Sequence, residues 1–154
     1  MLRLLLRVPV PWVFALTYLI GVVLEATVPI QTTQRPNANV MLLVGAVVFS
    51  IGAIIAGWGL VTFRGARTTT VPGRTSAQLV TWGPYRFTRN PMYVGLTIAY
   101  LGETLILRQI WPLILLPLTL AYVNWVVIPL EQGKLREAFG DEYVRYQARV
   151  RRWL

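Results

Sequence analysis

Neither cysteine nor histidine occurs anywhere in the 154 residues. Without cysteine the chain has no disulfide, no thiolate nucleophile and no sulfur ligand for a metal. Without histidine it lacks the commonest general base near neutral pH and the commonest metal ligand, so we expect no metal site. Any chemistry must rest on carboxylates, arginines, amides, hydroxyls or a bound cofactor.

Charge is also scarce: 14% of the residues are charged, against about 25% in a typical soluble domain. Hydrophobic residues make up 55%, and the mean hydropathy is +0.54. The 15 Lys and Arg against 6 Asp and Glu give a formal charge of +9. Because the arginines flank apolar runs, they indicate an anionic membrane surface, and we expect membrane lipid and no nucleic acid as partner.

Four apolar segments predict the fold. A bilayer core of about 30 Å requires roughly 20 apolar residues in a helix. Segments that meet or approach this length lie at about 11–28, 40–61, 93–107 and 110–130. The sequence therefore predicts one all-α integral membrane domain over 1–154, with four transmembrane helices, a long loop over 63–90 and a C-terminal amphipathic helix.

Small and polar residues inside these segments carry finer predictions. Pro117 predicts a kink in the fourth helix. Glu25 and Glu103 lie at membrane depth, where we expect a mutual polar contact or snorkelling rather than catalysis. The second segment carries small-xxx-small spacings that serve a packing face or are merely tolerated in a membrane helix. They involve Gly45, Ser50, Gly52, Ala53, Ala56 and Gly57.

The basic residues predict the orientation. Thirteen of the 15 fall before the first segment, between the second and third, or after the fourth, and only Arg35 and Arg108 fall on the other side. Cytoplasmic loops carry such an excess, so we expect both termini in the cytoplasm and the chain in an inner or plasma membrane.

The densest motif runs from Leu79 to Gly95 and reads LVTWGPYRFTRNPMYVG. Gly83 and Pro84 predict a turn, Arg86 and Arg89 supply cations, and Asn90-Pro91 predicts the start of the third helix, whose free N–H groups favour an anion. The motif is consistent with a small anionic ligand. It is equally consistent with a collar at the lipid head groups, in which Trp82, Tyr85 and Tyr93 are interface anchors.

A second motif follows the fourth segment, at Glu131-Gln132 and at FGDEY over 139–143. We predict two helical pieces broken at Gly140, with Tyr143, Tyr146, Val150 and Trp153 on one face and arginines away from it. Glu131 lies on the same side of the membrane as the loop motif. Its carboxylate could bind a cationic group or a ribose, or simply pair with a nearby Arg or Lys.

Together the two motifs resemble the isoprenylcysteine carboxyl methyltransferase family, which broadly includes phospholipid methyltransferases. The resemblance covers about Leu79 to Leu154 and lies in GPYRFxRNPMYxG, a hairpin of two spans, and ExxxLxxxFGxxYxxY. It implies that 79–154 is a cofactor-binding half that encloses S-adenosylmethionine, and that a lipophilic or prenylated substrate enters from the bilayer.

The resemblance assigns roles by position. It implies that Glu131 and Arg89 act at the reacting centre and that Arg86, Tyr143 and Tyr146 close the site or orient the acceptor. The chain departs from the family where members carry RHP, a Glu-Glu pair and a preceding arginine; it has Arg89-Asn90-Pro91, Glu131-Gln132 and Pro129-Leu130. The remaining cofactor contacts implied are Gly83, Pro84, Tyr85, Asn90, Pro91, Tyr93 and Gln132, with Glu131 shared.

The expected activity is methyl transfer from S-adenosylmethionine to a lipophilic acceptor, such as an isoprenylcysteine carboxylate, at the cytoplasmic face. A membrane reductase that uses a nicotinamide cofactor has a related motif, although such reductases usually have more spans. A non-catalytic adaptor is the other alternative. No Gly-rich nucleotide fingerprint follows a strand pattern, which excludes a soluble Rossmann enzyme.

Overall fold

The structure is a computed structural model that describes residues 9–30, 37–66 and 78–154. Those ranges contain helices and no β-strand. The main helices are α2 (Val10–Thr27), α3 (Ala38–Gly65), α4 (Pro91–Leu107) and α5 (Trp111–Tyr122), followed by the π-helical η2 (Val123–Val127) and by α6 (Ile128–Arg149). A 3-10 helix, η1 (Gly83–Arg86), precedes α4. Five of the basic residues from which the orientation was predicted, at positions 3, 7, 35, 67 and 74, lie outside the described residues.

Within the described ranges, three helical stretches are long and apolar enough to cross a membrane: Val10–Thr27, Ala38–Gly65 and Trp111–Arg149. The fourth, α4, has 17 residues, which corresponds to about 25 Å at 1.5 Å per residue. Large apolar side chains such as Leu43, Ile54 and Leu118 are each 68% exposed, as on a surface solvated by lipid. These features confirm the all-α integral membrane fold.

Two helices, α3 and α4, begin two residues earlier than their apolar runs. The side chain of Asn37 accepts hydrogen bonds from the backbone N–H groups of Asn39 and Val40, so α3 begins at Ala38 instead of residue 40. Pro91 occupies the first turn of α4, where its missing N–H costs nothing, so the helix starts at Asn90-Pro91 as predicted, two residues before its apolar run at 93.

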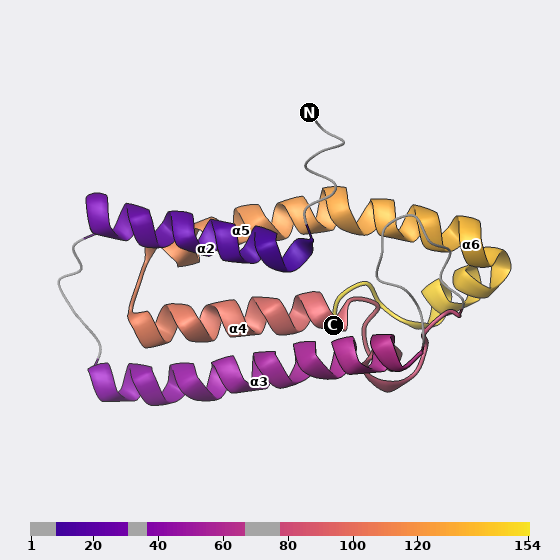
Figure 1. The fold of residues 1–154 in the computed structure, drawn as a ribbon, viewed down its shortest axis with the longest axis horizontal. Coiled ribbons are helices and arrows are strands. Elements are labelled where there is room, and N and C mark those ends of the chain that lie inside the picture. Colours follow the sequence, from indigo (N-terminus) through magenta and orange to yellow (C-terminus); the bar gives the residue numbers. More distant parts are fainter. Residues whose placement is uncertain (1–8, 31–36, 67–77) are drawn as a thin grey trace.

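Helices α2 to α5 form two pairs, as Figure 1 shows: α3 packs along α4, and α2 along α5. Contacts between α4 and α5 are few. One end of the bundle, here called the hairpin end, carries the turn from α4 to α5. The opposite end, here called the loop end, carries η1, the start of α4 and all of α6 (Figure 1).

Glycines allow α3 and α4 to approach closely. Gly45, Gly52 and Gly59 are buried along one face of α3, and Gly95 and Gly102 are buried on α4. A Cβ on Gly52 would lie 2.6 Å from the carbonyl oxygen of Gly95, so only glycine fits. The packing-face alternative therefore holds for Gly45 and Gly52, whereas a Cβ on Gly57 would meet nothing within 4 Å.

The carboxylate of Glu25 joins α2 to the start of α5 at the hairpin end. Its Oε2 accepts hydrogen bonds from the backbone N–H of Ile110, at 2.9 Å, and of Trp111, at 3.1 Å. These N–H groups have no partner within α5, and a negative charge there is favourable. Glu25, on α2, thus caps the start of α5. Its carboxylate makes this contact instead of the expected contact with Glu103.

The last helical stretch is irregular at two places. Pro117 lies inside α5, which continues to Tyr122, and an irregular π-helical turn follows at η2. Gly140 has φ +49° and ψ −125°, which breaks α6 into two pieces as predicted. Beyond Leu130 the helix is polar, and its second piece turns back over the loop end (Figure 1).

Candidate functional site

The loop before α4 is anchored on α3. Gly83 has φ +60°, and a Cβ there would lie 3.0 Å from the hydroxyl oxygen of Thr62. Pro84 and Tyr85 follow in η1 and are buried, and the Tyr85 hydroxyl points to the carbonyl oxygen of Gly59 at 3.5 Å. Burial raises the pKa of Tyr85, and the negative charge of Glu131 adds to the rise. This part of the loop is therefore held against α3.

The end of the chain binds the last three residues of this loop. The backbone N–H of Arg89 donates to the carbonyl of Arg151, at 2.9 Å. The Thr88 hydroxyl and the Asn90 side-chain amide both donate to the carbonyl of Arg152, at 3.1 and 2.7 Å. The amide nitrogen of Asn90 therefore holds the tail in place, while the sequence assigned Asn90 to the cofactor.

A direct hydrogen bond connects the two sequence motifs. The Tyr93 hydroxyl, on α4, donates to Oε1 of Glu131, on α6, at 2.6 Å. The Glu131 residue is exposed to solvent on one side, although protein atoms surround much of it. Desolvation raises the pKa of Glu131, while the Tyr93 hydrogen bond and the charge of Lys134 lower it. The remaining oxygen of this carboxylate can accept from a ligand.

The loop end also holds buried donors without a protein acceptor. They are Nε and Nη1 of Arg89 and Nε2 of Gln132. The Oε1 of Gln132 accepts from Nη2 of Arg152 at 3.3 Å, so the side chain is held by one end only. Buried polar groups are almost always satisfied, and a charged donor without a partner costs several kcal/mol at most sites. Three such atoms in one region indicate a place for an acceptor-bearing ligand.

The Arg89 guanidinium also faces Tyr143, which is 1% exposed. Burial raises the pKa of Tyr143, and the positive charge and hydrogen bond of Arg89 oppose that rise. Arg89 is thus held from one side by the second piece of α6. We call Arg89, Tyr93, Glu131, Gln132 and Tyr143 the polar cluster. No group of three or more potential metal ligands occurs in the described part of the chain.

The other residues expected at the site lie around the polar cluster. Pro91 is buried in the first turn of α4. The Tyr146 hydroxyl donates to the carbonyl of Tyr85 at 2.8 Å and so fixes α6 to the loop. Arg86 is exposed and lines a shallow depression with Arg149, apart from the cluster. The structure therefore brings Tyr143 and Tyr146 together near Arg89 and leaves Arg86 in other surroundings.

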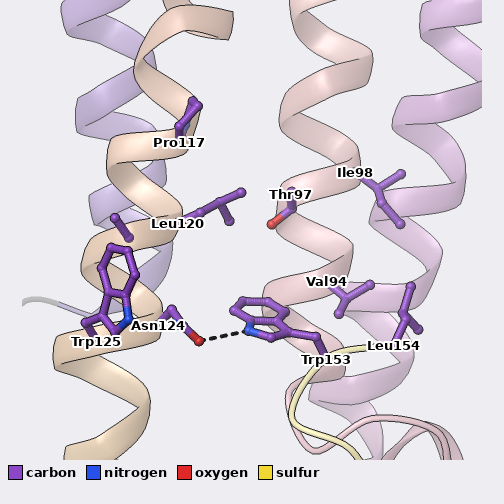
Figure 2. A pocket seen from close by; sticks show the side chains of 10 residues that line it. Val94, Thr97, Ile98, Pro117, Leu120, Asn124, Trp125, Trp153 and Leu154 are labelled. Atoms are coloured by element: carbon purple, nitrogen blue, oxygen red, sulfur yellow. Dashed lines mark hydrogen bonds between the residues drawn. The ribbon is translucent and has the colours of Figure 1, made fainter.

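An apolar groove of about 680 Å³ lies between α4 and the α5–η2 stretch. Figure 2 shows Thr97 and Leu120 facing each other across it and the indole of Trp153 at its end near the loop. Trp153 Nε1 donates to Oδ1 of Asn124 at 3.0 Å. Arg89 and Glu131 do not line the groove; it meets the polar cluster through Asn124, whose Oδ1 also accepts from Arg152 at 3.4 Å.

Sequence reasoning missed three residues that organise this region. It placed Trp153 and Arg152 on a helix, whereas α6 ends at Arg149 and Val150 is extended. It placed the arginines away from the apolar face, whereas Arg152 binds Asn124 and Gln132. Asn124 could have been noticed as an amide within an apolar span, where polar residues mark sites. Nothing in the basic tail distinguishes Arg152 from its neighbours.

These features define a class: a small helical membrane protein with a polar cluster at one end of the bundle and an apolar groove beside it. The phospholipid methyltransferase family model matches residues 40–142, about two thirds of the chain, and includes both motifs up to Glu142. The chain belongs to the phospholipid methyltransferase family, and the family resemblance predicted from the sequence is confirmed.

Two further comparisons are narrower. A protein of Haemophilus influenzae described as uncharacterized is 36% identical over 63 residues, which cover 41% of this chain and all of that protein. No solved structure matches the chain.

Proposed function

We propose that the chain transfers a methyl group from S-adenosylmethionine to a lipophilic acceptor at the cytoplasmic face of the membrane, with an isoprenylcysteine carboxylate or a related lipid-like molecule as acceptor. The Tyr93–Glu131 hydrogen bond carries the proposal, because it joins two motifs 38 residues apart beside buried donors that lack a protein acceptor. Family membership supports methyl transfer in general. The identity of the methyl donor and the class of the acceptor are part of the proposal.

The polar cluster fits the chemistry of the methyl donor. An anionic group such as a carboxylate suits the free N–H groups of Arg89, because hydrogen bonds from a charged donor are roughly twice as strong as neutral ones. The free oxygen of Glu131 suits an ammonium or a ribose hydroxyl, and Nε2 of Gln132 suits a carbonyl or ring nitrogen. A zwitterionic nucleoside therefore matches both charges of the cluster.

S-adenosylmethionine supplies an electrophilic methyl group on a sulfonium centre. Its transfer is a direct displacement that needs alignment and exclusion of water more than acid or base catalysis. In our proposal Arg89 and Glu131 hold the donor in place, and the buried rings of Tyr85 and Tyr143 keep water away. A chain without histidine or cysteine can perform this role.

Glu131→Gln is expected to weaken S-adenosylmethionine binding about tenfold, a loss of about 1.4 kcal/mol, because the amide keeps the shape but not the charge. Isothermal titration of protein in lipid nanodiscs measures the change. The matched control is Glu137→Gln, the same change at an exposed position of α6, which should bind as wild type does. Equal affinity of both variants would remove Glu131 from the site.

The titration also separates the alternatives. Saturable binding of S-adenosylmethionine without binding of NADPH supports the enzyme; binding of NADPH indicates a reductase, and binding of neither indicates an adaptor. Because burial raises the pKa of Glu131, this carboxylate loses its charge on acidification at a higher pH than an ordinary glutamate does. Donor affinity should fall with it in the wild type and should change less in Glu131→Gln.

Asn90→Ala should also weaken S-adenosylmethionine binding about tenfold, but through position rather than contact. Its amide nitrogen holds the Arg152 carbonyl at 2.7 Å, so its loss frees the tail that fixes Arg89. Hydrogen exchange should then rise at residues 150–154. Asn39→Ala, an exposed asparagine on α3 at the hairpin end, should change neither quantity. Weakened binding with unchanged exchange would instead make Asn90 a direct ligand.

A further inference from the structure

The groove and the polar cluster are separated by one short stretch of chain. Arg152 and Trp153 are adjacent residues beyond the end of α6. Arg152 reaches into the cluster, where its guanidinium donates to Gln132 at 3.3 Å and its carbonyl accepts from Asn90. Trp153 lies on the other side, in the groove (Figure 2). Arg152 and Trp153 therefore lie between the polar cluster and the groove.

A hydrogen bond fixes the indole of Trp153. Its Nε1 donates to Oδ1 of Asn124 at 3.0 Å, and Asn124 lies in the π-helical turn η2. A π-turn inserts an extra residue and redirects the side chains after it, and such turns often occur at functional sites. In Figure 2 the ring extends from the tail toward α5, across the end of the groove. The indole is thus held in a defined orientation.

The lining of the groove indicates its occupant. Its side chains are apolar except for the hydroxyl of Thr97 and the amide of Asn124, and no charged residue lines it. On the α5 side it runs into the lipid-facing surface, where Leu118 is 68% and Trp125 is 74% exposed. A volume of about 680 Å³ is within the range of ligand sites. This continuity with the lipid surface suits a single hydrocarbon chain.

We propose that Trp153 is the specificity-determining residue for the acceptor: its ring is the stop against which the hydrocarbon chain rests, so that the head group reaches the polar cluster past Asn124. The inference rests on the proposed function, since the head group is the group to be methylated. Removing the ring should let the chain slide deeper, toward the loop.

Photo-crosslinking tests the stop. The probe is phosphatidylcholine with a diazirine in the head-group half of one acyl chain, in nanodiscs of phosphatidylcholine and phosphatidylglycerol, with labelled peptides mapped by mass spectrometry. In the wild type we expect label on Leu120 and Thr97, several times above the lipid-facing Ile54 of α3. In Trp153→Ala the label should move severalfold toward residues 88–93. Trp12→Ala, an exposed tryptophan of α2 outside the groove, should leave the pattern unchanged.

Each outcome of the crosslinking experiment supports or overturns the proposal. Label in the groove no higher than on Ile54 shows that no chain is bound there. An unchanged pattern in Trp153→Ala shows that the ring is not the stop. Trp153→Phe keeps an aromatic ring without the hydrogen bond to Asn124, so it should shift the label less than alanine; if Trp153→Ala does not fold, a wild-type pattern in Trp153→Phe overturns the proposal.

S-adenosylmethionine binding, measured on the same samples, separates the two hypotheses. If the labelling of the groove changes in Trp153→Ala but S-adenosylmethionine does not bind, the proposed role of Trp153 is supported and the proposed methyltransferase activity is rejected. Donor binding without groove labelling does the reverse.

Discussion

Arg89→Gln should weaken S-adenosylmethionine binding by about 10- to 100-fold, the effect of losing charged hydrogen bonds that contribute about 1.5–3 kcal/mol. The reason is that Nε and Nη1 of Arg89 are buried without a protein acceptor, and glutamine offers one neutral amide in their place. Isothermal titration in nanodiscs measures the loss. Arg145→Gln, an exposed arginine on α6, should bind as wild type does.

Two further readouts make this prediction specific. S-adenosylmethionine without its carboxylate should bind the wild type weakly and should lose little more on Arg89→Gln, because the same interaction is already gone. A full loss for both ligands would show that Arg89 does not bind that carboxylate. Since a buried charge without a partner is costly, the ligand-free variant should be as stable as wild type or more stable.

Gly52→Ala should destabilise the fold by about 2–3 kcal/mol, the upper part of the range for overpacked cores. The new methyl group would lie 2.6 Å from the carbonyl oxygen of Gly95 and 2.8 Å from Cα of Ala99, and backbone atoms cannot move aside as side chains can. The two helices would have to separate along the whole α3–α4 contact. Thermal unfolding in detergent, followed by circular dichroism, measures the change.

Gly57→Ala is the matched control for Gly52→Ala, five residues along the same helix. A Cβ at Gly57 would meet nothing within 4 Å, and alanine favours a helix over glycine by up to about 1 kcal/mol. This variant should therefore be unchanged or slightly more stable. Equal destabilisation at both positions would mean that α3 does not pack on α4 through its glycines.

The membrane helices could be predicted from sequence because apolar length is a local property. Gly52 and Gly57 show where that information ends: both belong to small-residue spacings, but only Gly52 faces another helix. Likewise the acid at Glu25 was visible as costly at membrane depth, while its partners, the N–H groups of Ile110 and Trp111, depend on how α2 packs on α5.

For the site, the sequence located the two motifs but not the connection between them. Tyr93 and Glu131 were both expected there, and the structure joins them directly. The tail was misread because Tyr146, Val150 and Trp153 continue a helical spacing, whereas the helix ends at Arg149. That ending lets the carbonyl of Arg152 bind Asn90, a contact between residues 62 positions apart.

The most direct test of the account is a structure of the protein in lipid nanodiscs with S-adenosylhomocysteine at saturating concentration. The account predicts ligand density in contact with the guanidinium of Arg89 and the carboxylate of Glu131, at the loop end of the bundle. Density at the hairpin end, or an unchanged polar cluster with no ligand beside it, would contradict the account.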